Sequence, residues 1–185
     1  MNKDNVAVGK PRIAGSIYKA ALGTALPTDA KTKLDAGFKE LGYASEDGLT
    51  NANSRTTSDV KAWGGSVVAS PMTEHKDTLK LKLIEALNVE ALKAAFGEEN
   101  VSGTLEAGIT VKSNSQELAP AEWVVDMILG DCLHRHVIPN GQITEIGEIT
   151  YKDDTPVGYD ITITAYPDAK GNTHYEYTVK GTETT

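Results

Sequence analysis

The sequence predicts a mainly β protein: an antiparallel β-sandwich or barrel with one short flanking α-helix and a long N-terminal arm. From Val67 onward, short segments alternate apolar and polar residues, which is typical of half-buried strands. Gly, Asn and Asp residues separate these segments, as in turns. Helical spacing is confined to one short stretch. We therefore expect a single domain with an arm (1–66), a body (67–179) and a polar tail (180–185).

The arm is rich in glycine and polar residues and has no long apolar run. A segment of this kind cannot bury enough apolar surface to fold alone. We expect its packing partner to lie outside the monomer, which indicates assembly rather than catalysis.

The first body strand is predicted at residues 76–85, where leucines fall on one face and lysines on the other. Asn88 can cap a short helix, Val89–Phe96, and Gly97 can end it. The apolar side of this helix predicts that it covers the sheet. Residues 105–112 alternate again and predict the next strand.

The remaining strands are predicted at Ala121–Leu129, 132–138, 142–151, 158–166 and 173–179. Gly130 and Asp131 form a two-residue turn signal, so the strands on either side of them should pair as a hairpin. Gly147 suits a β-bulge, because the isoleucines around it break the period of two. Trp123 lies among apolar residues on one face and is expected in the core.

Charge and composition exclude several function classes. The net charge of −8 and pI of about 5.0 disfavour sequence-independent binding of nucleic acid, which needs clustered Lys and Arg. Cys132 is the single cysteine, so no disulfide can form within the chain. We expect no signal peptide and no membrane partner, because the apolar stretches are too short.

Cys132, His134 and His136 are the one cluster that suggests chemistry, since they share one face of a predicted strand. Three ligands along one strand span too far for a single ion, although a neighbouring pair could bind one with help from elsewhere. The alternative is a polar strand face that lines a surface or an interface. A nucleophilic Cys–His pair would lack a third, orienting group. We expect no catalytic residue, no metal and no cofactor.

Three stretches carry a family resemblance: residues 21–30 (ALGTALPTDA), 38–49 (FKELGYASEDGL) and 156–173. In their order and spacing they resemble the major tail proteins, or tail tube proteins, of long-tailed, non-contractile bacteriophages (siphophages), particularly those of Gram-positive hosts. The resemblance covers nearly the whole chain. Ala21 departs from it, because a proline is expected there.

The resemblance implies a structural virion protein and not an enzyme. Six copies would form a ring, and rings would stack into a tube assembled in the host cytoplasm. The tube would enclose the tape-measure protein and conduct DNA during ejection without binding it specifically. Its further partners would be the tail terminator and the distal tail or baseplate proteins.

Candidate contact residues between subunits or rings follow from the stretches of resemblance and from the one arm tryptophan. They are Leu22, Leu26, Leu41, Tyr43, Glu46, Asp47, Leu49 and Trp63. Trp63 lies beside two glycines and is either a core plug or an interface anchor. Residues 44–66 are expected to be mobile in a free subunit and ordered in the tube.

An acidic lumen would repel DNA phosphates, and the strand faces supply the candidates for it. They are Asp126, Glu145, Glu148 and Asp160. Two other functions stay open. One is a β-sandwich adhesin or carbohydrate-binding module on a virion or cell surface, with Tyr175 and Tyr177 as its aromatic residues. The other is an enzyme that uses His134 and His136.

Overall fold

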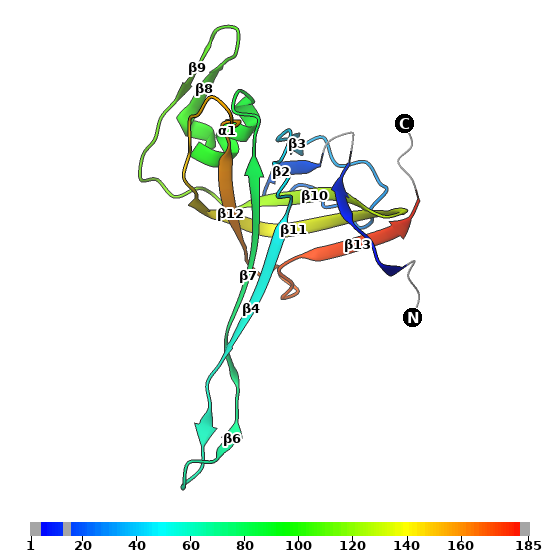
Figure 1. Cartoon of the computed structure of the whole chain (residues 1–185), viewed down its shortest axis with the longest axis vertical. Coiled ribbons are helices and arrows are strands. Elements are labelled where there is room, and N and C mark those ends of the chain that lie inside the picture. The colour runs from blue at the N-terminus through cyan, green and yellow to red at the C-terminus, as the bar shows by residue number, and fades with distance from the viewer. Residues whose placement is uncertain (1–4, 13–15, 182–185) are drawn as a thin grey trace.

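The computed structural model describes residues 5–12 and 16–181, which form a mainly β protein with one α-helix (Figure 1). The strands are β1 (Gly9–Pro11), β2 (Ile17–Ala21), β3 (Lys39–Glu40), β4 (Thr50–Thr57), β5 (Val60–Lys61), β6 (Val67–Ala69), β7 (Met72–Leu83), β8 (Val101–Thr104), β9 (Gly108–Val111), β10 (Ala121–Leu129), β11 (Cys132–Ile146), β12 (Tyr159–Ala165) and β13 (Tyr175–Lys180). The helix α1 spans Val89–Phe96, and a single 3₁₀ turn, Glu98–Asn100, follows it. The predicted antiparallel β fold with one helix is confirmed. The tail expected at 180–185 lies mostly outside the described residues.

Nine of the described strands form one antiparallel sheet in the order β3-β2-β10-β11-β12-β7-β4, with β1 paired to β10 and β13 paired to β11. The long strand β11 divides this sheet into two branches. Its first part, from Cys132 to Val137, pairs with β13, and its last part, from Gly141 to Ile146, pairs with β12. In Figure 1, β10, β11 and β13 run across the view, whereas β12, β7 and β4 run down it.

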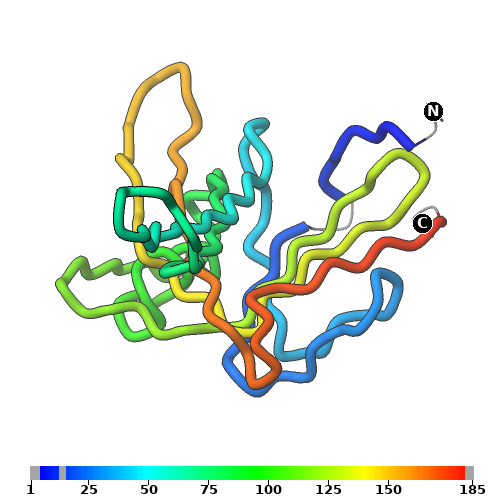
Figure 2. Tube along the Cα trace, turned by 90° about the horizontal axis from the view of Figure 1, so that it is seen from below, coloured from blue at the N-terminus to red at the C-terminus, as the bar shows by residue number. Residues whose placement is uncertain are grey.

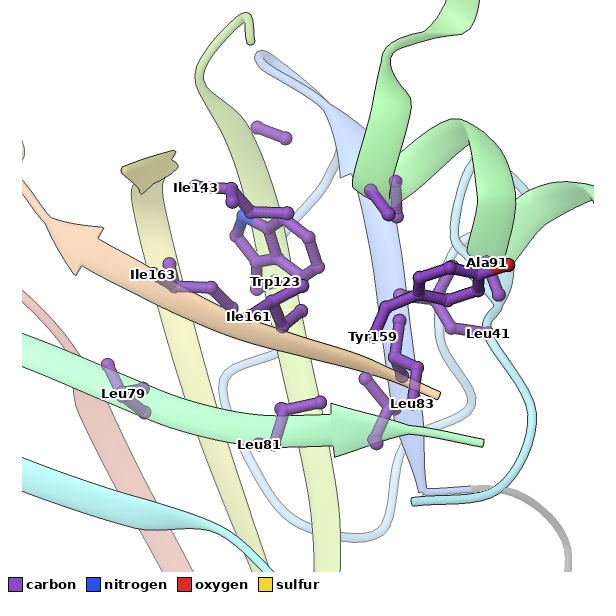
Figure 3. Close-up of a cluster of buried hydrophobic side chains, with 14 of the residues drawn as sticks. Leu41, Leu79, Leu81, Leu83, Ala91, Trp123, Ile143, Tyr159, Ile161 and Ile163 are labelled. Carbon is purple, nitrogen blue, oxygen red and sulfur yellow. The ribbon is translucent and has the colours of Figure 1, made fainter. Parts of the chain in front are cut away.

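The larger hydrophobic core joins the two branches and α1 (Figure 3). Trp123 of β10 is 1% exposed, and its indole N–H donates to the Gly141 carbonyl at 2.9 Å. Its neighbours in this core include Ile161 and Ile163 of β12 and the three buried leucines of β7. From Asp77 onward β7 buries every second residue, as the alternation predicts, whereas β12 buries Thr162 in addition to its alternate core residues.

The helix α1 begins and ends where the sequence indicates. The Asn88 side chain accepts a hydrogen bond from the Glu90 N–H at 3.0 Å, which caps the first turn. Gly97 follows the last turn with φ of 98°, and its N–H donates to the Lys93 carbonyl. Four residues of α1 are buried in the larger core, so the helix covers the sheet as expected: Ala91, Leu92, Ala94 and Ala95.

A second, smaller core lies on the opposite face of β2, β10 and β11. Val124 and Val137 lie between residues whose side chains point into the larger core, so their own side chains point to the opposite face. Phe38 and Ala20 pack against these two valines. This packing corrects the expectation that the whole arm finds its partner outside the monomer. Residues 16–41 are built into the sheet and its two cores, because β2 pairs along β10 and the following loop folds back over the sheet.

Two predicted strands differ from the structure. Residues 105–112 form no continuous strand, because β8 and β9 make a hairpin whose turn contains the exposed Leu105. Gly103 and Gly108 permit this hairpin with φ of 93° and 100°, a region that side chains disfavour. Gln142–Ile146 continues β11 rather than starting a new strand, and the register shift falls between Ile143 and Glu145 instead of at Gly147.

Residues 50–76 form what we call the projecting ribbon: β4, the first part of β7 and the small β5–β6 sheet at the tip (Figure 1). It extends away from the rest of the molecule. Figure 2 shows that the described chain ends lie elsewhere, near the β10–β11 turn. β1 pairs with the end of β10, and the Gly181 N–H donates to the Asp131 carbonyl at 3.0 Å.

Candidate assembly surface

The projecting ribbon exposes both of its faces to solvent. All eight residues of β4 are exposed, as are the first five of β7, Met72–Lys76. β4 is also the last strand in its sheet order, so no strand within residues 5–12 and 16–181 pairs with its outer edge. An isolated two-stranded ribbon is marginally stable, and an open strand edge is a template for another chain. The ribbon is therefore the part of the described chain most in need of an external partner.

The tip of the ribbon is apolar. Its exposed large side chains are Val60, Trp63, Val67, Val68 and Met72. Trp63 is fully exposed, at 106%, in the turn between β5 and β6. The Ala62 N–H donates to the Ser66 carbonyl and the Gly65 N–H to the Ala62 carbonyl, which closes this turn. Of the two predicted roles of Trp63, the core plug is wrong for the single chain, and the anchor stays a prediction.

The loop 42–49 presents a second exposed aromatic residue. Tyr43 is 72% exposed, yet its backbone is held, because its N–H donates to a Glu85 carboxylate oxygen at 3.0 Å and its carbonyl accepts from the Ile84 N–H at 3.0 Å. Glu46 and Asp47 are exposed on the same loop, whereas Leu49 is half-buried against the larger core. The two backbone bonds of Tyr43 fasten the start of this loop to the segment before α1.

The other predicted contact residues separate into surface and core. Leu22 is 51% exposed, and Leu26 is half-buried against the second core. Leu41 is 1% exposed within the larger core, so its prediction as an inter-subunit contact was wrong. Phe38 and Leu41 are the buried apolar residues of the stretch 38–49, and they fill the two cores of the monomer.

A groove of about 920 Å³, lined by both apolar and charged side chains, opens beside the loop 42–49. Leu49, Leu81, Val125 and Met127 supply its apolar lining, and β1 forms one of its borders. The groove and the apolar tip of the ribbon are built from different residues of one chain, so the two surfaces are not copies of each other.

The four predicted lumen residues do not share one environment. Glu145, Glu148 and Asp160 are exposed. Asp160 pairs across strands with Lys82, and such partners share a face, so this polar face carries both signs of charge. The face is therefore not uniformly acidic.

The prediction that Asp126 faces the lumen was wrong, because this residue is 3% exposed and cannot line an open face. Arg135 donates to its carboxylate from Nε at 2.6 Å and from Nη2 at 2.8 Å, and Arg12 donates at 2.9 Å. Arg135 also donates from Nη1 to the carbonyls of Asp29 and Thr32, at 3.0 and 2.8 Å. This cluster fastens the loop after β2 to the sheet.

The residues of the alternative functions are also placed. Tyr175 and Tyr177 are half-buried and packed against the second core, so they do not form an open aromatic platform. His134 and His136 converge on Glu176 of β13, and Cys132 is not part of that group. Sequence reasoning missed Glu176, because the pairing of β13 with β11 is remote in sequence.

No helix within residues 5–12 and 16–181 has the length and apolar character needed to cross a membrane. Residues 1–184 match the model of a protein family described as phage tail tube protein. No curated protein matches the chain. The family match spans nearly the whole sequence and agrees with the resemblance carried by residues 21–30, 38–49 and 156–173.

Proposed function

The chain belongs to the phage tail tube protein family, and from this we propose that six copies form a ring and that rings stack into the tube of a non-contractile tail. Members of this family are structural components of the virion tail that assemble with themselves and with other tail proteins. In our proposal the tube encloses the tape-measure protein during assembly in the host cytoplasm and conducts DNA at ejection. The proposed host is a Gram-positive bacterium.

The observation that carries this proposal is the projecting ribbon, with both faces exposed and an open edge at β4. Backbone N–H and C=O groups along such an edge gain hydrogen bonds when a strand of another copy pairs with them. Repetition of that pairing around a ring joins the sheets of all copies. The ribbon then becomes part of a larger sheet instead of a marginal hairpin.

The apolar tip around Trp63 supports contact between copies. A large aromatic side chain that is fully exposed on a closed turn fits the role of an interface anchor. The apolar tip and the groove beside the loop 42–49 are different surfaces of one chain. Surfaces that are not self-complementary favour head-to-tail association, which generates rings or filaments.

The polar face of β7 and β12 suits the wall of a DNA channel. Lys80 and Lys82 lie opposite Thr162 and Asp160, so positive and negative charges are mixed and large apolar side chains are absent from these four positions. At these positions Asp160 offsets one of the two lysines, and the chain as a whole carries a net charge of −8, which disfavours retention of phosphates. DNA would pass along it without being retained.

The remaining proposed partners cap the two ends of the tube. A terminal ring exposes the surface that would otherwise contact the next ring, and this surface needs cover to stop growth. We assign that role to the tail terminator at one end and to the distal tail or baseplate proteins at the other.

Electron microscopy of the purified protein over a range of concentrations tests the proposal, and rings or tubes are the expected result. Trp63→Ala should abolish them without changing the circular dichroism of the subunit. Tyr151→Ala is the matched control, because Tyr151 is 76% exposed outside the ribbon. A wild-type protein that stays a strict monomer under every condition would count against the ring, and normal tubes from Trp63→Ala would remove the tip from the interface.

A further inference from the structure

Three of the four histidines of this chain lie together on one side of the β11–β13 pair. The histidine cluster consists of His134 and His136 on β11 and of His174 and Glu176 at the start of β13. His134 and His136 are 5% and 7% exposed. One ligand atom each from His134, His136 and Glu176 lies within 4.8 Å of the other two.

The Nε2 atoms of all three rings are close to the same carboxylate. His134 Nε2 lies 3.7 Å from Glu176 Oε2, and His136 Nε2 lies 3.8 Å from Glu176 Oε1. His174 Nε2 is 3.3 Å from Oε1. Glu176 therefore sits at the centre of three imidazoles contributed by two paired strands.

The opposite ring nitrogens of two histidines have acceptors of their own. His134 Nδ1 is 2.7 Å from the Thr178 hydroxyl, and His174 Nδ1 bonds the Asp77 carboxylate, which is 1% exposed. An imidazole that donates from Nδ1 keeps its lone pair on Nε2. In that tautomer the Nε2 lone pairs face the Glu176 carboxylate oxygens, an arrangement that becomes favourable when either a metal ion or a proton on Nε2 lies between them.

We propose that the histidine cluster binds one Zn²⁺ ion through His134, His136 and Glu176, with His174 as the fourth ligand. Imidazole and carboxylate are the donors that zinc takes in proteins, whereas magnesium and calcium prefer oxygen ligands alone. Zinc–nitrogen bonds of about 2.0–2.1 Å in a tetrahedron put ligand atoms about 3.3 Å apart. The three Nε2–carboxylate separations are 3.3 to 3.8 Å, and the ligand atoms of His134, His136 and Glu176 all lie within 4.8 Å of one another, so side-chain rotations have to bring the four ligands to an ion.

The surroundings hold the proposed ligands in place. His136 is 7% exposed, and its ring packs against those of His134 and His174, with ring centroids 4.9 and 5.7 Å apart. Asp77 is held in turn by the Asn51 amide at 2.7 Å and by the Thr173 hydroxyl at 2.6 Å. A bound ion would thus connect β11 and β13 directly and β7 through Asp77, whether or not the chain forms a tube.

Calorimetric titration of the untagged, chelator-treated protein with zinc chloride tests this site. We expect one Zn²⁺ per chain and a rise in the unfolding temperature on binding. Titration with Co²⁺ in place of zinc should give the visible absorption bands of a tetrahedral ion. Glu176→Gln and His136→Ala should each weaken the affinity by at least about tenfold.

His75→Ala is the matched control, because His75 is the one histidine outside the cluster and lies on the exposed ribbon. The zinc affinity of the His75→Ala variant should equal that of the wild-type protein. If His136→Ala misfolds, the zinc affinity of Glu176→Gln still tests the site. This variant should fold, because the Glu176 side chain is 48% exposed. Absence of saturable binding in the wild type would overturn the proposal, as would an equal loss in His75→Ala.

Discussion

Arg135 of β11 and Asp126 of β10 lie directly opposite each other and form a buried ion pair with two hydrogen bonds. Both residues are at most 3% exposed. The third nitrogen of the guanidinium group donates to the carbonyls of Asp29 and Thr32. One side chain therefore satisfies a buried carboxylate and fixes the loop that covers the second core.

Arg135→Ala should lower the free energy of unfolding by about 3–5 kcal/mol, because it leaves a buried carboxylate with less compensation and frees the loop. Urea denaturation followed by circular dichroism measures this loss. Arg55→Ala is the control: Arg55 lies on the exposed strand β4, and its removal should cost less than about 0.5 kcal/mol. A loss below about 1 kcal/mol for Arg135→Ala would show that the pair does not organise the loop.

Asp29 makes the same loop sensitive to acid. The Thr32 hydroxyl, the Thr32 N–H and the Lys31 N–H all donate to its carboxylate and lower its pKa from 3.8 to about 2. A lowered pKa in the folded state stabilises the protein above pH 3.8, and this contribution is lost as the pH falls towards 2. The difference in unfolding free energy between the wild type and Asp29→Asn should therefore shrink from pH 5 to pH 2. A difference that stays constant over this range would contradict the assignment.

Gly141 leaves no room for a side chain where β11 passes Trp123. A Cβ atom there would lie 2.8 Å from Trp123 Cδ1 and 2.8 Å from Ile163 Cγ2. Gly141→Ala should therefore destabilise the larger core by about 1–3 kcal/mol. Tryptophan fluorescence during denaturation, recorded in a Trp63→Phe background, reports on Trp123 alone. Gly9→Ala is the control, because its Cβ would meet Leu129 at an ordinary 3.4 Å.

The sequence predicts those parts of the fold that depend on local periodicity. The alternation in β7 and β12 identifies the faces that meet the larger core, and Asn88 and Gly97 mark the ends of α1, whereas β10 is buried on both faces from Ala121 to Asp126. It also contains a signal for the buried pair. A two-residue turn at Gly130 and Asp131 places Asp126 opposite Arg135, so their opposite charges could have been matched from the hairpin register.

Features that depend on distant pairing could not be predicted in this way. β4 has no apolar face, so its sequence resembles a loop, and only its hydrogen bonds to β7 make it a strand. Glu176 meets His136 because β13 returns to β11 after about 40 residues, a pairing that no local pattern encodes. Leu41 resembles a surface residue of a polar arm until β2 is seen to lie inside the sheet.

Amide hydrogen exchange should distinguish the ribbon of a free subunit from the ribbon of an assembled one. In the single chain, β4 is bonded on one side only and both ribbon faces are exposed. We expect amides of residues 44–66 to exchange fast in the free subunit and at least about tenfold more slowly in tubes, because pairing with a neighbouring copy closes the open edge. Amides of β12 should change little, since this strand is paired on both sides in one chain. Equal protection of residues 44–66 in both states would mean that the ribbon is not the element ordered by assembly.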